Sequence, residues 1–256
     1  MKLDEFIDKK CTVSKRQESF YQGNKFIHGL AKSGKTSLAV NLGKDGKKPL
    51  FISTEQGLTA IDGVTSYEVS NWLAFTKVAE ILVADKENFK EKFSHLVVDL
   101  VSDLYHMCTL YVCDKYDVVH PEDIGKMGKG FNLVTYAFKT TMIPLLQAMP
   151  CVFISHTTDR LIMFNGEPTN VQAPDMSKGG LTFLTGKCDF VGFIKPPAKK
   201  GKHPKLSFTS SGRTAIAGSR FNFMQTEFEL DPNNLKGSVE AIEAYMQKQL
   251  KEGEGK

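Results

Sequence analysis

The chain has 256 residues, 41% of them hydrophobic, and a formal net charge of +4. This length is enough to bury one substantial core, and we expect one large domain and not two small ones. No apolar run approaches the roughly 20 residues of a membrane span, and the start, MKLDEFIDKK, has no apolar signal region, so a soluble, unexported, cytoplasmic protein is predicted. The charge is too small to establish a polyanionic partner by itself.

Short apolar runs alternate with helix-period segments along the chain. Strands that are apolar throughout and separated by helices predict an α/β fold with a largely parallel central sheet and helices on both faces. After Gly179 the pattern changes to strands separated by Pro, Gly and Lys, which predicts an antiparallel C-terminal extension of the sheet. The predicted strands cover 25–29, 49–54, 95–100, 150–155, 189–195, 205–211 and 221–230, and the predicted helices cover 35–42, 72–84, a segment ending near 116, 131–149, 181–185 and 235–250.

Three regions are expected. Residues 1–22 hold a short amphipathic pattern of Leu3, Phe6 and Ile7, which caps the core or serves as an oligomerisation arm on a neighbouring subunit. Residues 23–250 form the single α/β domain. Residues 251–256, KEGEGK, form a disordered tail.

The stretch GLAKSGKT, residues 29–36, matches the phosphate-binding pattern GxxxxGK[ST]. Its glycines let successive backbone N–H groups face phosphate oxygens, the lysine reaches the outer phosphates, and the threonine hydroxyl ligates Mg²⁺. The helix that begins there adds its positive dipole end. A coincidental glycine loop is the alternative. The predicted nucleotide-binding residues are Gly29, Ala31, Lys32, Ser33, Gly34, Lys35, Thr36 and Ser37.

Three polar residues follow other predicted strands. Asp99 ends HLVVD and is the expected Mg²⁺ aspartate, with a helix N-cap as the alternative. Glu55 follows PLFIST and is placed to polarise an attacking water, with a solvated turn residue as the alternative. His156 ends PCVFISH, where it senses the terminal phosphate or is a hydrogen-bonded core histidine.

The five cysteines are an odd number without a close CxxC pair, which favours a reducing cytosolic compartment. Two of the cysteines and two nearby histidines could alternatively form a metal site, but the spacing of these four residues matches no standard metal-binding pattern and their segment has a helical pattern. The residues concerned are His106, Cys108, Cys113 and His120.

These segments together resemble the RecA-type recombinase core. PLFISTEQG is similar to the strand ending in the catalytic glutamate, which implies that Glu55 is the general base. LVVDLVSDL is similar to the strand with the magnesium aspartate, Asp99. VFISHTTDR resembles the strand ending in the residue that couples phosphate state to DNA; RecA has glutamine there and related hexameric helicases have histidine, as in His156.

The resemblance covers about Lys25 to Leu230 and implies two DNA-binding loops, one around DVVHPEDIGKMGKGFN and one in GEPTNVQAPDMSKGG. In its size and order the chain is most similar to short RecA-like single-strand annealing proteins of bacteriophages, the phage nucleotide-binding protein family. That likeness implies a homo-oligomeric ring or filament in the host cytoplasm that uses ATP and Mg²⁺, with a single-strand-binding protein as a further partner.

RecA-like cores also imply an arginine that reaches the phosphates of a neighbouring subunit. Helicase relatives carry it in a Lys-x-Arg-Phe pattern, and here AGSRF keeps Arg220 and Phe221 but has Gly218 in place of the lysine. Arg220 is therefore the candidate trans finger, with Arg213 in reserve, and the alternative is an exposed strand arginine.

Binding of single-stranded DNA needs cations along the backbone and flat groups on which bases stack. The first loop offers cations and an aromatic residue among glycines, and the stretch 157–178 is predicted to be a long structureless loop. The lysine-rich stretch KPPAKKGKHPK is either a solvated hairpin tip or a further DNA-binding element. Sequence-independent, salt-sensitive binding is expected. The candidate DNA-binding residues are Lys126, Lys129, Phe131, Arg160 and Lys178.

The leading hypothesis is therefore an ATPase, stimulated by single-stranded DNA, that promotes annealing or strand exchange. Three alternatives stay open: a replicative helicase core or loader, a P-loop nucleoside or small-molecule kinase, and a nucleotide-gated binding protein that hardly hydrolyses. A kinase is expected to carry an arginine-rich lid, and the stretch from Arg160 to Lys187 has no second arginine.

Overall fold

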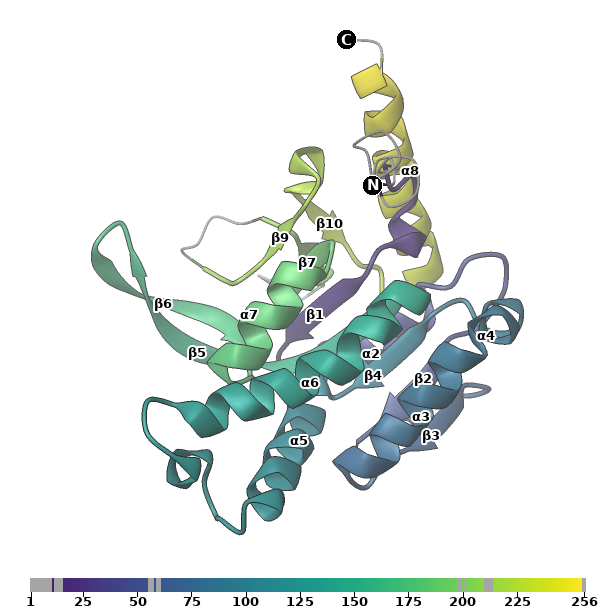
Figure 1. Cartoon of the computed structure of the whole chain (residues 1–256). Helices are drawn as coiled ribbons and strands as arrows, with labels where there is room; N and C mark the ends of the chain where they lie inside the picture. The colour runs from purple at the N-terminus through teal and green to yellow at the C-terminus, as the bar shows by residue number, and fades with distance from the viewer. Residues whose placement is uncertain are drawn as a thin grey trace.

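The computed structural model describes residues 11, 16–54, 58, 61–197, 199, 201–209 and 214–254, and within them ten strands form one connected sheet (Figure 1). The strand order is β10-β8-β7-β1-β5-β4-β2-β3, with β6 beside β5 and β9 beside β7. The strands are β1 (Lys25–Gly29), β2 (Leu50–Ser53), β3 (Thr65–Glu68), β4 (Leu96–Asp99), β5 (Cys151–Phe164), β6 (Glu167–Pro174), β7 (Phe190–Lys195), β8 (Lys205–Ser207), β9 (Gly218–Ser219) and β10 (Glu227–Glu229).

Helices cover both faces of the sheet (Figure 1). Successive residues of a strand point to opposite faces, so Phe26 of β1 belongs to one core and Ile27 to the other. The first core contains side chains of α3, α5, α6 and α7, and the second contains side chains of α2 and α8. The helices are α2 (Lys35–Val40), α3 (Trp72–Ala84), α4 (Lys86–Lys92), α5 (Val101–Lys115), α6 (Lys129–Ala148), α7 (Lys178–Lys187) and α8 (Leu235–Glu254), with 3-10 turns η1 (Phe20–Gln22), η3 (Pro121–Ile124) and η4 (Asn222–Met224).

The predicted α/β fold class is confirmed. Strands β1 to β5 and β7 pair in parallel, and β8 and β10 add antiparallel pairs after β7. The sequence pattern did not indicate β3, because all four of its residues are exposed on an edge strand and carry no apolar alternation. Helix α8 continues to Glu254, so the predicted disordered tail is wrong for residues 251–254.

The start of the domain lies earlier than predicted. Phe20 is fully buried against Phe190 and Phe208, and its backbone N–H donates to Glu243 of α8 at 2.7 Å. Residues 16–22 therefore pack on their own chain. The amphipathic pattern of Leu3, Phe6 and Ile7 lies outside the described residues.

The long structureless loop predicted over 157–178 is wrong. Strand β5 runs on past the sheet and pairs with β6 from Thr157↔Pro174 to Phe164↔Glu167, which makes a projecting hairpin (Figure 1). Its turn is Asn165–Gly166, both with positive φ, as two-residue hairpin turns require. Exposed and half-buried side chains alternate over residues 161–164, as expected for a strand. All four residues are apolar, so the sequence shows no polar–apolar alternation, and the Pro and Asn content of the segment suggested a loop.

The predicted first DNA loop is partly helical. Pro121–Ile124 form η3, and Lys129 and Phe131 lie in the first turn of α6. Residues 117–120 and 125–128 remain outside helices, and the second of these turns has positive φ at Gly125, Met127 and Gly128. The lysine-rich stretch connects β7 to β8, and Lys195 pairs there with Glu227.

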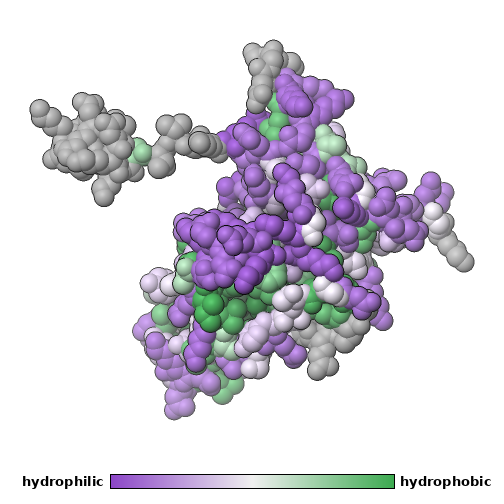
Figure 2. Space-filling model, turned by 90° about the vertical axis from the view of Figure 1, so that its right-hand side faces the viewer, coloured by the Kyte–Doolittle hydropathy of each residue, from purple (hydrophilic) through white to green (hydrophobic). Residues whose placement is uncertain are grey.

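The side of the molecule seen in Figure 2 is mostly hydrophilic, with hydrophobic residues gathered in its lower half. Among the helices of the described residues, none combines the length and apolar character that a bilayer crossing requires.

Candidate nucleotide-binding site

The phosphate-binding loop, Asp99 and His156 meet at one edge of the sheet. In the strand register Gly29 at the end of β1 lies opposite His156 of β5, and Asp99 at the end of β4 lies opposite Ser53 of β2. Since these strands are parallel neighbours, their carboxyl ends form one continuous edge, where ligands bind in open α/β sheets.

The backbone of the phosphate-binding loop has the conformation that its glycines permit. Gly34 has φ +88° directly before α2, which favours glycine. At Gly29 a Cβ atom would lie 2.8 Å from Ser33 Oγ and 3.2 Å from Ile194, so a larger residue would displace the loop. The Oγ atom of Ser33 is buried and makes no hydrogen bond within the described residues, which leaves it suited to a phosphate oxygen.

Lys35 lies at the centre of the loop and is 5% exposed. Its ammonium donates to the carbonyls of Gly29 at 3.0 Å and Leu30 at 2.8 Å, and to Nδ1 of His156 at 3.3 Å. A buried ammonium needs such partners, and phosphate oxygens satisfy the same donors. Nδ1 of His156 accepts here, so its ring proton in the neutral form is on Nε2.

Thr36 and Asp99 are adjacent, with the threonine hydroxyl donating to Asp99 Oδ2 at 2.7 Å. A hydroxyl and a carboxylate are hard oxygen donors, so this pair fits Mg²⁺, which takes few protein ligands and completes its shell with water and phosphate oxygens. Asp99 is 7% exposed, which keeps the carboxylate in place at the edge.

Glu55 lies outside the described residues. Its neighbour Thr54 is hydrogen-bonded to the backbone of Asp99 and Leu100. The Thr54 N–H donates to the carbonyl of Asp99 at 2.9 Å, and the Thr54 hydroxyl accepts from the N–H of Leu100 at 3.0 Å. The hydroxyl also lies 3.3 Å from the carboxylate of Asp103. The sequence pattern did not single out Thr54, because a threonine at a strand end has no distinctive spacing.

An apolar pocket of about 390 Å³ opens beside the phosphate-binding loop. Its walls come from the loop, from the β7–β8 connection and from the start of α8, and such walls suit the flat face of a nucleobase. The lining residues away from the loop are Pro196, Pro197, Pro204, Leu230, Pro232 and Leu235.

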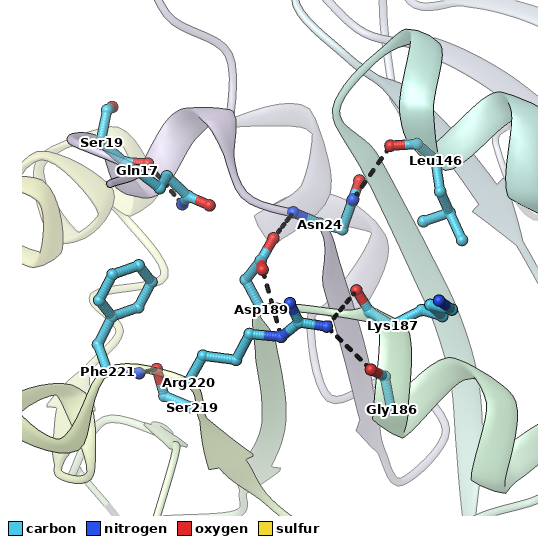
Figure 3. Close-up of polar contacts among 10 residues, drawn as sticks. All are labelled: Gln17, Ser19, Asn24, Leu146, Gly186, Lys187, Asp189, Ser219, Arg220 and Phe221. Carbon is cyan, nitrogen blue, oxygen red and sulfur yellow. Dashed lines mark hydrogen bonds and ion pairs between the residues drawn. The ribbon is translucent and has the colours of Figure 1, made fainter. Parts of the chain in front are cut away.

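Arg220 lies near Asp189 and Asn24, where the parallel strands β7 and β1 begin (Figure 3). The phosphate-binding loop follows the other end of β1, so Arg220 is at the opposite edge of the sheet from its own loop. Its guanidinium is 3.5 Å from Asp189, which directly precedes β7, and donates to the carbonyls of Gly186 at 2.8 Å and Lys187 at 3.3 Å in the last turn of α7. Asp189 also accepts from the N–H of Asn24, which precedes β1. The arginine is 54% exposed, and the reserve candidate Arg213 lies outside the described residues.

Most candidate DNA-binding residues are exposed. Lys126, Lys129, Phe131 and Lys178 are exposed at the N-terminal ends of α6 and α7, which lie on the same side of the molecule as the hairpin (Figure 1). Arg160 differs, because its guanidinium donates to the carbonyl of Met176 in its own subunit.

The alternative metal site is not formed. Within the described part of the chain, no three His, Cys, Asp or Glu side chains are placed to hold a metal ion. Cys108 is buried and contacts the carbonyl of Val134, whereas His106 is exposed on another face of α5.

His28 is a buried polar residue that the sequence analysis missed. It lies in β1 one residue before the loop, and burial lowers its pKa to about 4. Its position inside the apolar run KFIHG was the available signal, because a histidine in a fully buried strand needs hydrogen-bond partners.

The comparisons with known proteins agree with this geometry. Among curated proteins the chain is similar to the SPbeta prophage-derived uncharacterized protein YorG of Bacillus subtilis (strain 168), with 36% identity over 107 residues, which are 42% of this chain and 31% of that protein. The chain thus spans about a third of the length of this relative. The profile of a family described as AAA domain matches residues 24–221, from the residue before β1 to Phe221. Since that match covers more than half of the sequence and contains the whole phosphate-binding loop, the chain belongs to the AAA-domain family of P-loop ATPases.

Proposed function

We propose that this protein is an ATP-dependent, sequence-independent single-stranded DNA-binding protein that assembles from identical subunits and promotes strand annealing or exchange. The observation that carries the proposal is the 3.3 Å contact between Lys35 and His156. His156 is part of β5, and β5 continues from there into the projecting hairpin. The residue that contacts Lys35, His156, is thus directly followed by the first residue of the projecting β5–β6 hairpin, Thr157.

The residues of the site have distinct roles in this proposal. Lys35 and the loop bind the phosphates of ATP, and Thr36 and Asp99 hold Mg²⁺, which neutralises charge on the phosphates when bound. Glu55 is the candidate base that orients and deprotonates the attacking water. His156 senses the terminal phosphate through the contact that it shares with Lys35.

DNA binding is proposed for the side of the molecule that carries the hairpin. Lys126, Lys129 and Lys178 supply cations, and exposed Phe131 supplies a stacking surface. Leu161 and Met163 add apolar contacts on the hairpin, where they are 66% and 68% exposed. These contacts favour sequence-independent binding of DNA. The contacts between lysines and phosphates weaken as the salt concentration rises.

The position of Arg220 supports the proposed head-to-tail assembly. An arginine at the edge opposite its own site cannot serve that site, but it can serve the site of a neighbouring subunit in a ring or filament. The contacts to Asp189, Gly186 and Lys187 would have to be exchanged for contacts across the interface.

The prophage origin of the similar B. subtilis protein supports a phage origin for this chain as well. The proposed setting is the cytoplasm of the host cell, with a single-strand-binding protein as a second partner. A kinase is less well supported, because Arg160, the arginine of the hairpin, is bonded to Met176 of its own chain and does not form an arginine-rich lid.

The test is the ATPase rate of the purified protein with and without single-stranded DNA, in parallel with nucleoside acceptors. We expect stimulation by DNA and no phosphate transfer to an acceptor. Transfer to a nucleoside would exclude the recombination function. DNA affinity that is the same with and without nucleotide, and unaltered by Lys35→Ala, would instead indicate a passive annealing protein.

Salt dependence provides a second test. The double variant Lys126→Ala/Lys129→Ala is expected to lower the slope of log affinity against log salt by up to about 1.4, since each phosphate contact on a single strand contributes about 0.7. The matched control is Lys86→Ala/Lys90→Ala on α4, which removes the same charge from a helix away from the hairpin. Equal effects of the two variants would place DNA elsewhere on the protein.

A further inference from the structure

His28 makes two hydrogen bonds although it is fully buried in the central strand β1. Nε2 lies 2.8 Å from the carbonyl of Ile216, and Nδ1 lies 2.8 Å from the hydroxyl of Thr157. A carbonyl only accepts, so Nε2 carries the proton, and Nδ1 accepts the hydroxyl proton of Thr157. The ring also stacks on Phe193 with centroids 5.0 Å apart, which fixes its orientation.

These two bonds hold both strands of the hairpin at its base. Thr157 begins the pairing of β5 with β6, opposite Pro174. Ile216 is bonded to β6, because its N–H donates to the carbonyl of Gln172 at 2.8 Å. One side chain of β1 therefore holds β5 directly and β6 through Ile216.

Residues next to His28 and Thr157 in the sequence bind the phosphate-binding lysine, Lys35. Gly29 and Leu30, which follow His28, supply the carbonyls that accept from Lys35, and His156, which precedes Thr157, supplies Nδ1. Phosphate oxygens compete for these ammonium hydrogens, so nucleotide binding changes the contacts on both sides of the His28–Thr157 bond.

We propose that His28 is a positioning residue that couples occupancy of the phosphate-binding loop to the β5–β6 hairpin. The coupling passes through the Thr157 hydroxyl to β5 and through Ile216 to β6. This inference rests on the nucleotide-binding part of the proposed function and does not require that the hairpin binds DNA.

The neutral form of the ring is needed for this role, because a protonated Nδ1 could not accept from Thr157. Burial lowers the pKa of His28 to about 4, so the ring stays neutral near pH 7. Lysine or arginine could not replace it, since neither side chain has an acceptor.

The test measures backbone hydrogen–deuterium exchange of residues 158–173 in the full-length protein, with and without ATP and Mg²⁺. In the wild type we expect ATP to change the exchange rate of these amides at least threefold. Thr157→Val has the shape of threonine without the hydroxyl and is expected to weaken the change, because only the route through Ile216 remains, while nucleotide affinity stays within twofold. Thr157→Ser keeps a hydroxyl and is expected to preserve it.

His28→Leu is the second variant, because leucine has no donor or acceptor, and His95→Leu is its matched control. His95 is also buried, with Nε2 3.0 Å from the carbonyl of Ala39 and Nδ1 2.9 Å from the hydroxyl of Ser94, and neither partner lies in the hairpin. We expect loss of the ATP-dependent change in His28→Leu and its retention in His95→Leu, with folding of both checked by thermal unfolding.

Each outcome decides the question. A full ATP-dependent change in Thr157→Val or His28→Leu overturns the coupling, as does a wild type that binds ATP with no change in the hairpin. Equal loss in His95→Leu also overturns it, since the effect would then be one of general destabilisation. Absence of ATP binding in the wild type would contradict the proposed function itself.

Discussion

The hydroxyl of Thr36 donates to the carboxylate of Asp99 at 2.7 Å, which joins the phosphate-binding loop to the end of β4 across the strand β5 that lies between β1 and β4. Sixty-three positions separate the two residues in sequence. Parallel strands bring them together because the end of each strand lies at the same edge, and the pair offers two hard protein oxygens that would suit Mg²⁺ there.

Asp99→Asn is expected to lower ATP turnover by about 100-fold, because the amide keeps the size of the side chain but removes the charge that holds the metal. ATP binding without Mg²⁺ should change little. The measurement is steady-state hydrolysis across a Mg²⁺ titration. Asp114→Asn, an exposed change on α5, is the control, and a variant Asp99→Asn with normal Mg²⁺ dependence would remove Asp99 from the metal site.

Glu55→Gln is expected to reduce turnover by about 10²–10⁴-fold, the range over which general bases act, while nucleotide binding persists. The glutamine retains the size of the side chain but cannot take a proton at neutral pH. Single-turnover hydrolysis, with binding followed by a fluorescent ATP analogue, separates the two effects. Glu68→Gln on the exposed edge strand β3 is the control, and retained turnover in Glu55→Gln would exclude the base role.

The role of Arg220 is tested by mixing two inactive variants. Lys35→Ala has an intact arginine, and Arg220→Ala has an intact loop, so about a quarter of the interfaces in an equal mixture combine both intact parts. We expect the mixture to recover up to about this share of wild-type activity. Without recovery, Arg220 acts within its own chain.

Asp189→Asn separates assembly from stability at the same place. It weakens the ion pair with Arg220 but leaves the arginine, so this variant alone should retain ATP turnover, whereas Arg220→Ala alone should lose it. If Arg220 serves only to hold the last turn of α7, Arg220→Ala and Asp189→Asn should both lower thermal stability, and Arg220→Ala should not complement Lys35→Ala.

Acid is expected to destabilise the protein through two buried histidines. Burial lowers the pKa of His28 to about 4 and that of His95 to about 3, from an ordinary value of 6.5. Below pH 6.5 the unfolded chain therefore binds protons that the folded chain excludes, and the free energy of unfolding falls as pH falls toward 4, by at most about 1.4 kcal/mol per pH unit for each histidine.

Urea unfolding between pH 7.5 and 4.5 measures this slope. Below pH 6.5, His95→Gln should lower the slope by up to about 1.4 kcal/mol per pH unit, because it removes one of the two groups. His106→Gln, on the exposed surface of α5, is the control. An unchanged slope in His95→Gln would mean that His95 is not held neutral in the folded protein.

The sequence by itself determined the fold class and the centre of the site. Buried parallel strands are apolar along their whole length, so β1, β2, β4 and β5 were visible as runs, and the glycines, lysine and threonine of the loop follow from local phosphate chemistry. Asp99 could be predicted for the same reason, since a polar residue directly after an apolar run marks the end of a buried strand.

Only the tertiary structure decided what the remaining polar residues do. Arg220 meets Asp189 and the end of α7, His28 meets Thr157 and Ile216, and the stretch after His156 becomes a hairpin. Each outcome depends on partners more than ten positions away in sequence or on register with another strand. Local pattern carries no information about such partners, because the strand order of the sheet, and not the order of the chain, determines which side chains meet.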